Sequence, residues 1–136
     1  MSNSLTAALQ ALLAADATLV ATAVGGVWVD PAPDGISQPF VVLEQSFGTD
    51  EDGGGGPRYT TVAYEVSAVA PAASVAEART AAARLDVLLD YKSGLSLTGF
   101  SVLGCRRTAP IDEHLEEASG RWVKVGGEYT LVVQAT

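Results

Sequence analysis

The chain of 136 residues is long enough for one domain with its own core and too short for two. Sixteen acidic against eight basic residues give a formal net charge of −8, which argues against tight nucleic-acid binding, because such binding relies on Lys and Arg at the phosphates. The single cysteine excludes an intramolecular disulfide and is typical of a protein made in a reducing cytoplasm.

The N-terminal segment is predicted to be an amphipathic helix. Its apolar residues recur at the spacing of one helix face, and they are Leu5, Ala8, Leu9, Leu12 and Leu13. Asp16 is placed to cap one or two further helical turns, and Gly25-Gly26 is placed to end them. The first twenty residues lack a basic start and contain several polar residues, so they predict neither a signal peptide nor a membrane span.

Two strands and two loops are predicted next. Val27-Trp28-Val29 and the segment from Phe40 to Gln45 are rich in β-branched and aromatic residues, which favour strands. Residues 30–39 contain three prolines and a glycine and are predicted to be a loop. Residues 48–57 have no large apolar side chain to bury, so the Gly-rich segment at about 46–57 is predicted to be a flexible loop.

A third strand and a second helix follow. The segment from Tyr59 to Ala68 alternates between apolar and more polar residues, as a half-buried strand does. Ser74-Val75-Ala76-Glu77 has the spacing of a capping box and predicts the start of a helix that ends at Gly94. The predicted core stripe of this helix is Val75, Ala78, Ala82, Leu85 and Leu89.

The C-terminal part is predicted to contain two more strands. They run from Phe100 to Arg106 and from Arg121 to Val133, and we favour a bulge at Gly126-Gly127 within one long strand over a tight turn. The acidic residues 112–120 between them are open to a helical turn or a loop. The candidate acidic face, exposed or directed into the lumen of an assembly, consists of Asp112, Glu113, Glu116 and Glu117.

This order of elements predicts the fold class. We expect one α+β domain over residues 1–136, with a single mixed or antiparallel sheet of about four to five strands and two helices packed on one face. The other sheet face is predicted to be polar. It would be solvated, line the interior of an assembly or contact a neighbour.

The sequence contains no pattern that predicts a catalytic, phosphate-binding or metal site. His114 lies in the acidic segment and Cys105 in a predicted strand, without the partners that a nucleophile and base require. The four consecutive glycines lead into Pro57-Arg58, not into the Lys and Ser or Thr of a phosphate-binding loop. The acidic runs lack the spacing of a calcium loop. We therefore predict a protein that is not an enzyme and has no catalytic, cofactor-binding or metal site.

Several motifs follow one another along nearly the whole chain. In order, they are Leu5-x-x-Ala-Leu-x-x-Leu-Leu, Ala14-Ala15-Asp16-x-x-Leu19, Gly25-Gly26-Val27, Gln38-Pro39-Phe40-Val41-Val42-Leu43-Glu44, Tyr64-Glu65-Val66, Ala76-Glu77-Ala78-Arg79 and Leu85-x-x-Leu88-Leu89. A proline-rich loop and a Gly-rich acidic loop separate some of them. Taken together, these features resemble the tail-completion, or tail terminator, proteins of long-tailed bacteriophages.

The resemblance implies a structural subunit of a virion, assembled in the bacterial host cytoplasm. Tail terminators are thought to form a six-fold ring on the head-proximal end of the tail tube, to stop its growth and to supply the surface that joins the neck. The implied partners are further copies of the chain, the tail tube protein and a head-completion or connector protein. DNA would pass through without specific binding, no membrane is involved, and the family has no catalytic residues.

The Gly-rich loop is our candidate assembly contact, because its composition suits folding on contact with a neighbouring subunit or the tube. The candidate contact residues are Asp50, Glu51, Asp52, Gly53, Gly54, Gly55, Gly56 and Arg58. Two other functions remain open at this point. One is another neck component, such as a head-completion or connector protein. The other is a small-molecule-binding domain with a pocket between helices and sheet.

Overall fold

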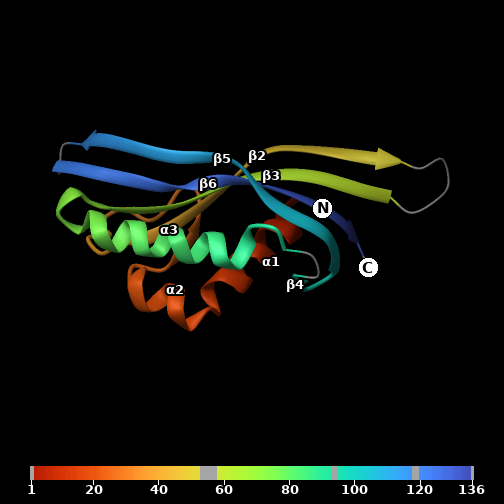
Figure 1. Ribbon diagram of the computed structural model, residues 1–136, viewed down its shortest axis with the longest axis horizontal. Coiled ribbons are helices and arrows are strands. Elements are labelled where there is room, and N and C mark those ends of the chain that lie inside the picture. The colour runs from red at the N-terminus through yellow and green to blue at the C-terminus, as the bar shows by residue number, and fades with distance from the viewer. Residues whose placement is uncertain (1, 53–57, 93–94, 118–119, 136) are drawn as a thin grey trace.

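The computed structural model describes residues 2–52, 58–92, 95–117 and 120–135, without the side chains of residues 2–3, 49–52, 58 and 135 (Figure 1). The elements in chain order are α1 (Ser2–Ala14), α2 (Ala17–Thr22), β1 (Val27–Val29), β2 (Phe40–Asp52), β3 (Arg58–Pro71), the 3-10 helix η1 (Ala72–Ser74), α3 (Val75–Leu89), β4 (Ser96–Leu97), β5 (Phe100–Glu117) and β6 (Gly120–Ala135).

The sheet is larger than the sequence predicts. Six strands lie in the order β1-β2-β3-β6-β5-β4, and only the β1–β2 pair is parallel. β2, β3, β5 and β6 each have 13 or more residues, so the described chain is mostly β. The expectation of four to five strands with two helices packed on one face is therefore wrong.

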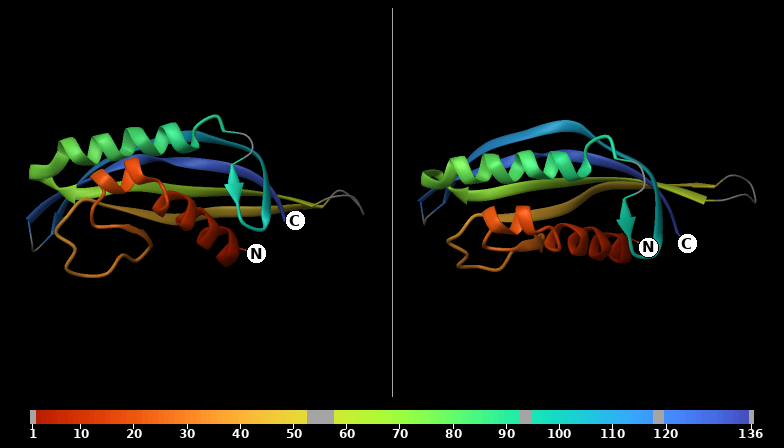
Figure 2. Two further views of the ribbon diagram at one scale, coloured as in Figure 1. Left: turned by 90° about the horizontal axis from the view of Figure 1, so that it is seen from below. Right: turned by 60° about the horizontal axis from the view of Figure 1, so that its bottom comes forward.

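The helices lie inside a curled sheet rather than on a flat one. α3 packs against β3 and β6, and α2 packs against α3. α1 contacts both β1 and β4, which are the two opposite edge strands, so the sheet bends far enough for both edges to reach the same helix (Figure 2). Strand twist accumulates across the six strands, four of which are long, and this explains why a flat two-layer arrangement is not formed.

Two buried tyrosines connect the sheet to the helices. Tyr64 on β3 and Tyr129 on β6 are direct cross-strand neighbours, and each is at most 1% exposed. The Tyr64 hydroxyl and the Thr6 hydroxyl on α1 are 2.7 Å apart, within hydrogen-bonding distance. The Tyr129 hydroxyl donates to Oδ1 of Asp86 on α3 at 2.9 Å. One tyrosine pair therefore positions both long helices, and burial raises the pKa of both phenols.

The predicted helix faces agree well with the observed core. Leu5, Leu9 and Leu13 of α1 are fully buried, as the leucine spacing predicts. In α3 the buried positions are Ala78, Ala81, Leu85 and Leu89. Of the predicted stripe, Val75 and Ala82 are only half-buried, because α3 is rotated slightly so that Ala81 faces the sheet instead.

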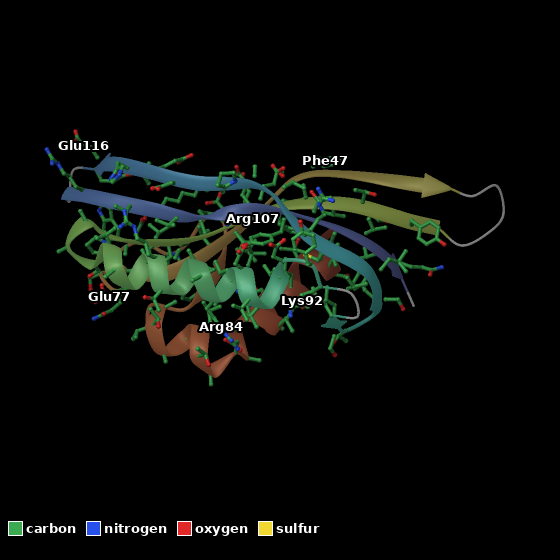
Figure 3. The ribbon with its side chains drawn as sticks, in the orientation of Figure 1. Phe47, Glu77, Arg84, Lys92, Arg107 and Glu116 are labelled. Atoms are coloured by element: carbon green, nitrogen blue, oxygen red, sulfur yellow. The ribbon has the colours of Figure 1, made fainter. Side chains whose placement is uncertain are left out.

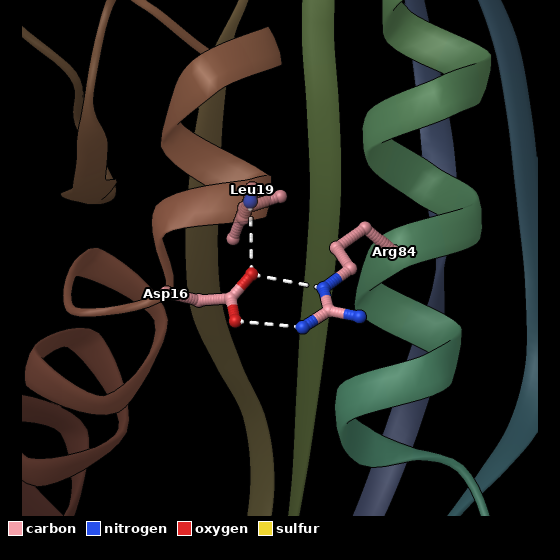
Figure 4. Close-up of polar contacts among 3 residues, drawn as sticks. All are labelled: Asp16, Leu19 and Arg84. Atoms are coloured by element: carbon pink, nitrogen blue, oxygen red, sulfur yellow. Dashed lines mark hydrogen bonds and ion pairs between the residues drawn. The ribbon is translucent and has the colours of Figure 1, made fainter.

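Asp16 joins α2 to α3 (Figure 4). Its Oδ2 accepts from the Leu19 amide at 2.8 Å, which confirms its predicted role as helix cap. The same carboxylate binds Arg84 of α3 in a two-point contact, Nε to Oδ2 at 2.9 Å and Nη2 to Oδ1 at 2.8 Å. The hydrogen bond from Arg84 is the main reason that the pKa of Asp16 lies below its ordinary value.

Asp16 therefore predicts a defined pH dependence. Asp16→Asn keeps a capping side chain but loses the ion pair, whereas Asp16→Ala loses both and is expected to cost about 1 kcal/mol for the cap. Because the folded-state pKa is lowered, the stabilisation is complete above the unfolded value of 3.8 and is lost as the pH falls through the folded value. Urea titrations of wild type and Asp16→Asn should converge at low pH. If the difference in stability between wild type and Asp16→Asn stays constant from neutral pH down to pH 2, the ion pair of Asp16 with Arg84 is not its cause.

Two local predictions about the second half of the chain are wrong. Residues 112–117 belong to β5 and Gly120 already belongs to β6, so the described part of this segment is strand, and residues 118–119 lie outside the described residues. β6 is one long strand rather than two strands joined by a tight turn, as we favoured, but the predicted bulge is absent, because its register runs through Gly126-Gly127 without a shift. The irregularities lie in β5 at Leu103 and Thr108 and in β2 at Ser46. Pairing along a long β6 outweighs the weak strand preference of acidic residues and glycine.

The observed end and N-terminal cap of α3 also differ from the prediction. The helix ends at Leu89 rather than at Gly94, and Ser74 makes no side-chain cap hydrogen bond. Ser74 is the last residue of η1 and has φ −108° and ψ 28°, so its backbone is not in the extended conformation of a capping residue. The predicted loop at residues 30–39 contains no helix or strand and is confirmed.

Candidate functional site

The sheet face opposite the helices, called the outer face below, carries a row of three acidic residues. Glu44 on β2 is paired in register with Glu65 on β3, and Glu65 is paired with Glu128 on β6. Side chains directly opposite one another on one face have Cβ atoms roughly 5 Å apart. Strand pairing thus gathers Glu44, Glu65 and Glu128, called the glutamate row below, from three distant parts of the sequence.

The only side-chain partners that the described residues offer Glu128 are hydroxyls. Glu128 Oε1 accepts from Thr108 Oγ1 at 3.1 Å, and Oε2 accepts from Ser46 Oγ at 3.4 Å. Ser46 and Thr108 are the residues at which the registers of β2 and β5 shift, so these irregularities direct both hydroxyls toward the row. Among the described residues no Lys or Arg forms an ion pair with the row, and no acidic cluster is arranged to hold a metal ion.

The glutamate row should therefore reduce the stability of the isolated chain. Like charges directly opposite one another in a sheet are destabilising, by roughly 0.2–1 kcal/mol for a pair. Glu65→Gln is expected to raise the free energy of unfolding by about 0.5 kcal/mol at low salt, and the gain should shrink as salt screens the charges. Urea titrations of wild type and Glu65→Gln at two salt concentrations measure this gain and its dependence on salt.

A control for Glu65→Gln lies on the same face. Glu113 is paired in register with Lys124, so Glu113→Gln removes a favourable pair and should lower the stability slightly. If Glu65→Gln and Glu113→Gln shift the stability in the same direction, repulsion within the glutamate row does not explain the effect of Glu65→Gln.

The predicted assembly-contact segment lies at one end of the sheet. Strand β2 continues through Asp52, so the first part of the segment expected as a loop is strand, and Asp52 pairs with Arg58 at the start of β3. The side chains of Asp50, Glu51, Asp52 and Arg58, and all of residues 53–57, lie outside the described part of the structure. We call residues 47–52 and 58–62 the β2–β3 ribbon. It extends past the helices (Figure 1).

The ribbon has one unpaired edge and two exposed aromatic residues. β1 pairs only with residues 41–43 of β2, so in the described structure the edge of β2 beyond Leu43 has no neighbouring strand. Phe47 is 49% exposed and Tyr59 is 37% exposed. Figure 3 shows Phe47 on the side of the sheet away from α3. Exposed edges and aromatic side chains favour contacts with other chains. The sequence alone predicted neither the unpaired edge nor the two exposed aromatic residues.

The second predicted site, the acidic face, is split by the strand geometry. Asp112, Glu113, Glu116 and Glu117 are all exposed on β5, but alternate residues of a strand point to opposite faces, so they form no single face. Arg121 Nε lies 3.4 Å from Glu116 Oε1, and both side chains are about 80% exposed, so this ion pair adds little stability. Glu116 lies at the far end of the sheet from the ribbon (Figure 3).

The residues with reactive side chains are unfavourably placed for catalysis. Cys105 is buried, and desolvation raises its pKa to about 12, so the thiol stays protonated at neutral pH. His114 is exposed on β5, nine positions along the same strand. No described helix is long and apolar enough to cross a membrane.

Comparisons with known proteins agree with a tail component. The family described as "Tail completion protein gp17" matches residues 7–132 of this chain. A solved structure titled "Virion of native gene transfer agent (GTA) particle" contains a similar chain, with a TM-score of 0.70 and 24% identity over 96% of this chain and 98% of that one. At this identity the likeness shows a shared fold. No curated protein matches. The chain belongs to the tail completion protein gp17 family and is a structural protein of the virion tail or neck.

Proposed function

We propose that this protein caps the head-proximal end of the tail tube, ends tail polymerisation and provides the surface to which the head is joined. The observation that carries the proposal is the family match over residues 7–132, which includes most of α1 and β6 and all of the elements between them. The capping unit would be a homohexameric ring. Closed rings are built from heterologous contacts, in which two different surfaces of one chain meet on successive copies.

In this ring the glutamate row would face the channel through which DNA passes. The three carboxylates lie in one register row and have no described cationic partner. A surface of this kind repels phosphates, which allows DNA to move without being held. The mutual repulsion of the three residues costs stability in the isolated chain, and a role in the assembly accounts for that cost.

The tip of the ribbon would contact a neighbouring subunit or the tail tube. Residues 48–57 are rich in glycine and acidic residues and have no large apolar side chain, a composition that suits ordering on contact with a neighbour. Hydrogen exchange should show stronger protection of these amides in assembled particles than in the free chain. Equal exchange in both states would contradict this part of the proposal.

Deletion of the gene in the parent virus or gene transfer agent tests the capping function. Electron microscopy should show tails of variable, excessive length without heads, and supply of the wild-type gene in trans should restore uniform tails joined to heads. Tails of normal length without heads would instead indicate a head-completion or connector function. Normal tails joined to heads would reject both functions.

A further inference from the structure

A shallow apolar groove lies beside β5 at the ribbon end of the sheet. Its volume is about 380 Å³, and its walls are almost entirely apolar. Gly104 and Arg106 of β5 line it together with Thr130 and Val132 of β6, and Tyr91 and Lys92 close it from the strand edge. A Cβ atom added at Gly104 would meet nothing within 4 Å. The missing side chain at Gly104 therefore contributes to the hollow.

Tyr91 gives the groove an exposed aromatic wall. The residue is 81% exposed and has φ 54°, in the left-handed region that non-glycine residues seldom adopt. It follows the C-cap Asp90 of α3, a position at which helices usually place glycine. A tyrosine there costs roughly 1–2 kcal/mol relative to an unstrained backbone and buries little of its ring in the isolated chain. Its presence is explained if the ring contacts another molecule.

The groove also carries unpaired positive charge in an acidic protein. Lys92 and Arg106 are exposed, and no described acidic side chain forms an ion pair with either of them. Arg84, Arg107 and Arg121, by contrast, each have a carboxylate partner. In a chain with a net charge of −8, two neighbouring free cations beside an apolar hollow form a site suited to an acidic, aromatic partner.

The β2–β3 ribbon has that complementary chemistry. Phe47 and Tyr59 are its exposed aromatic residues, and by sequence β2 continues into Asp50, Glu51 and Asp52. The ribbon lies past the helices and presents an unpaired edge (Figure 1). A partner with an aromatic side chain would fill the apolar hollow, and acidic neighbours of that side chain would complement the charge of Lys92 and Arg106.

A ribbon cannot occupy the groove of its own chain. Phe47 pairs with Ala63, Ala63 with Thr130, and Thr130 with Arg106, so the ribbon and the groove lie in one cross-strand row with β3 and β6 between them. To turn into its own groove, the ribbon would have to break the pairing of β3 with β6. The occupant must therefore come from another copy. This contact joins two different surfaces, which is the heterologous type that closes into rings.

We propose that the groove lined by Tyr91, Lys92, Gly104 and Arg106 binds the β2–β3 ribbon of the neighbouring copy. The proposal rests on the ring that is part of the proposed function, and it names the two surfaces that join successive subunits. The ribbon of each copy binds the groove of the next, with Phe47 in the hollow.

Disulfide cross-linking tests the contact directly. In a Cys105→Ala background, chains with Phe47→Cys are mixed with chains with Thr130→Cys under mild oxidation, so that only a ribbon-to-groove contact yields the mixed dimer. The mixed dimer should form in clear excess over both homodimers. Val87→Cys, at an exposed position of α3, serves as the control and should not cross-link. Predominant homodimers, or no mixed dimer at all, would overturn the proposal.

Variants of the groove separate its role in assembly from folding. Tyr91→Gly removes the ring and relieves the left-handed strain, so it should keep or raise the melting temperature while weakening self-association, measured by sedimentation, about tenfold or more. Gly104→Leu fills the hollow without a backbone clash and should also weaken association. Arg106→Glu should do so as well, whereas Arg79→Glu, the same charge change on the exposed surface of α3, should not. Association unchanged in all three groove variants would overturn the proposal.

Particle assembly distinguishes this contact from the function itself. If gene deletion gives overlong tails and Gly104→Leu also fails to restore uniform tails, both the function and the contact are supported. If deletion gives overlong tails and Gly104→Leu restores normal particles, the capping function stands and the groove contact is wrong. If deletion leaves tails normal while the mixed cross-link forms, the contact stands and the capping function is wrong.

Discussion

Replacing Gly126 with alanine is expected to destabilise the chain severely, by about 3 kcal/mol or more, or roughly 10 °C in melting temperature. A Cβ atom at this position would overlap the Val66 carbonyl oxygen and would lie 2.6 Å from the Ser67 Cα, both of which belong to the backbone of β3. A backbone in the centre of a sheet cannot move aside without breaking its ladder to β2 as well. Thermal and urea unfolding of the purified variant measure the effect.

Gly104→Ala is the matched control for Gly126→Ala. Gly104 is also a strand glycine, but an added Cβ meets no atom within 4 Å, and φ is outside the left-handed region. The substitution should be neutral or slightly stabilising, by up to about 0.5–1 kcal/mol, because alanine restricts the unfolded chain. Similar losses from both substitutions would show that a general cost of replacing strand glycines, and not the close approach of β3 and β6, explains Gly126.

Replacing Tyr129 with alanine is expected to cost about 3–5 kcal/mol, because it leaves a large cavity between β6 and α3. Tyr129→Phe isolates the hydroxyl and should cost about 1–2 kcal/mol, since it removes the hydrogen bond to Asp86. Asp86 keeps a second partner, because Arg107 Nη1 lies 3.5 Å from the same oxygen. Urea titrations of the two variants separate packing from hydrogen bonding.

The pH dependence provides an independent measurement at Tyr129. Burial, followed by the hydrogen bond to Asp86, raises the pKa of Tyr129 well above the ordinary 10.0. A raised folded-state pKa means that stability is complete below pH 10 and falls above it, where only the unfolded chain ionises. Tyr129→Phe should therefore lose less stability than wild type between neutral and alkaline pH.

Tyr64→Phe is the control for the alkaline comparison. Tyr64 is the cross-strand neighbour of Tyr129, and its hydroxyl is hydrogen-bonded to a neutral threonine rather than a carboxylate. Desolvation raises the pKa of Tyr64 as well, but the hydrogen bond with Thr6 opposes it, so Tyr64→Phe should reduce the alkaline loss of stability by less than Tyr129→Phe does. An alkaline loss in Tyr129→Phe as large as in wild type would exclude Tyr129 as its source.

The local sequence was sufficient for several elements. The leucine spacing of residues 5–13 predicted α1 and its buried face, because one apolar face of a helix recurs within a few residues. The prolines of residues 30–39 predicted the loop, and Asp16 predicted a cap, because both depend on neighbouring backbone alone. The order of these motifs also indicated the family, which the match over residues 7–132 confirms.

The lengths of the strands and the surfaces that they build were decided by tertiary structure. Residues 112–117 have the composition of a loop, yet they are strand, because β6 offers a full row of backbone partners. The glutamate row, the groove beside Gly104 and the contact at Gly126 each join segments that are 12 or more positions apart. Strand order and register create these juxtapositions. They depend on pairing across the whole sheet, so local periodicity in one sequence does not reveal them.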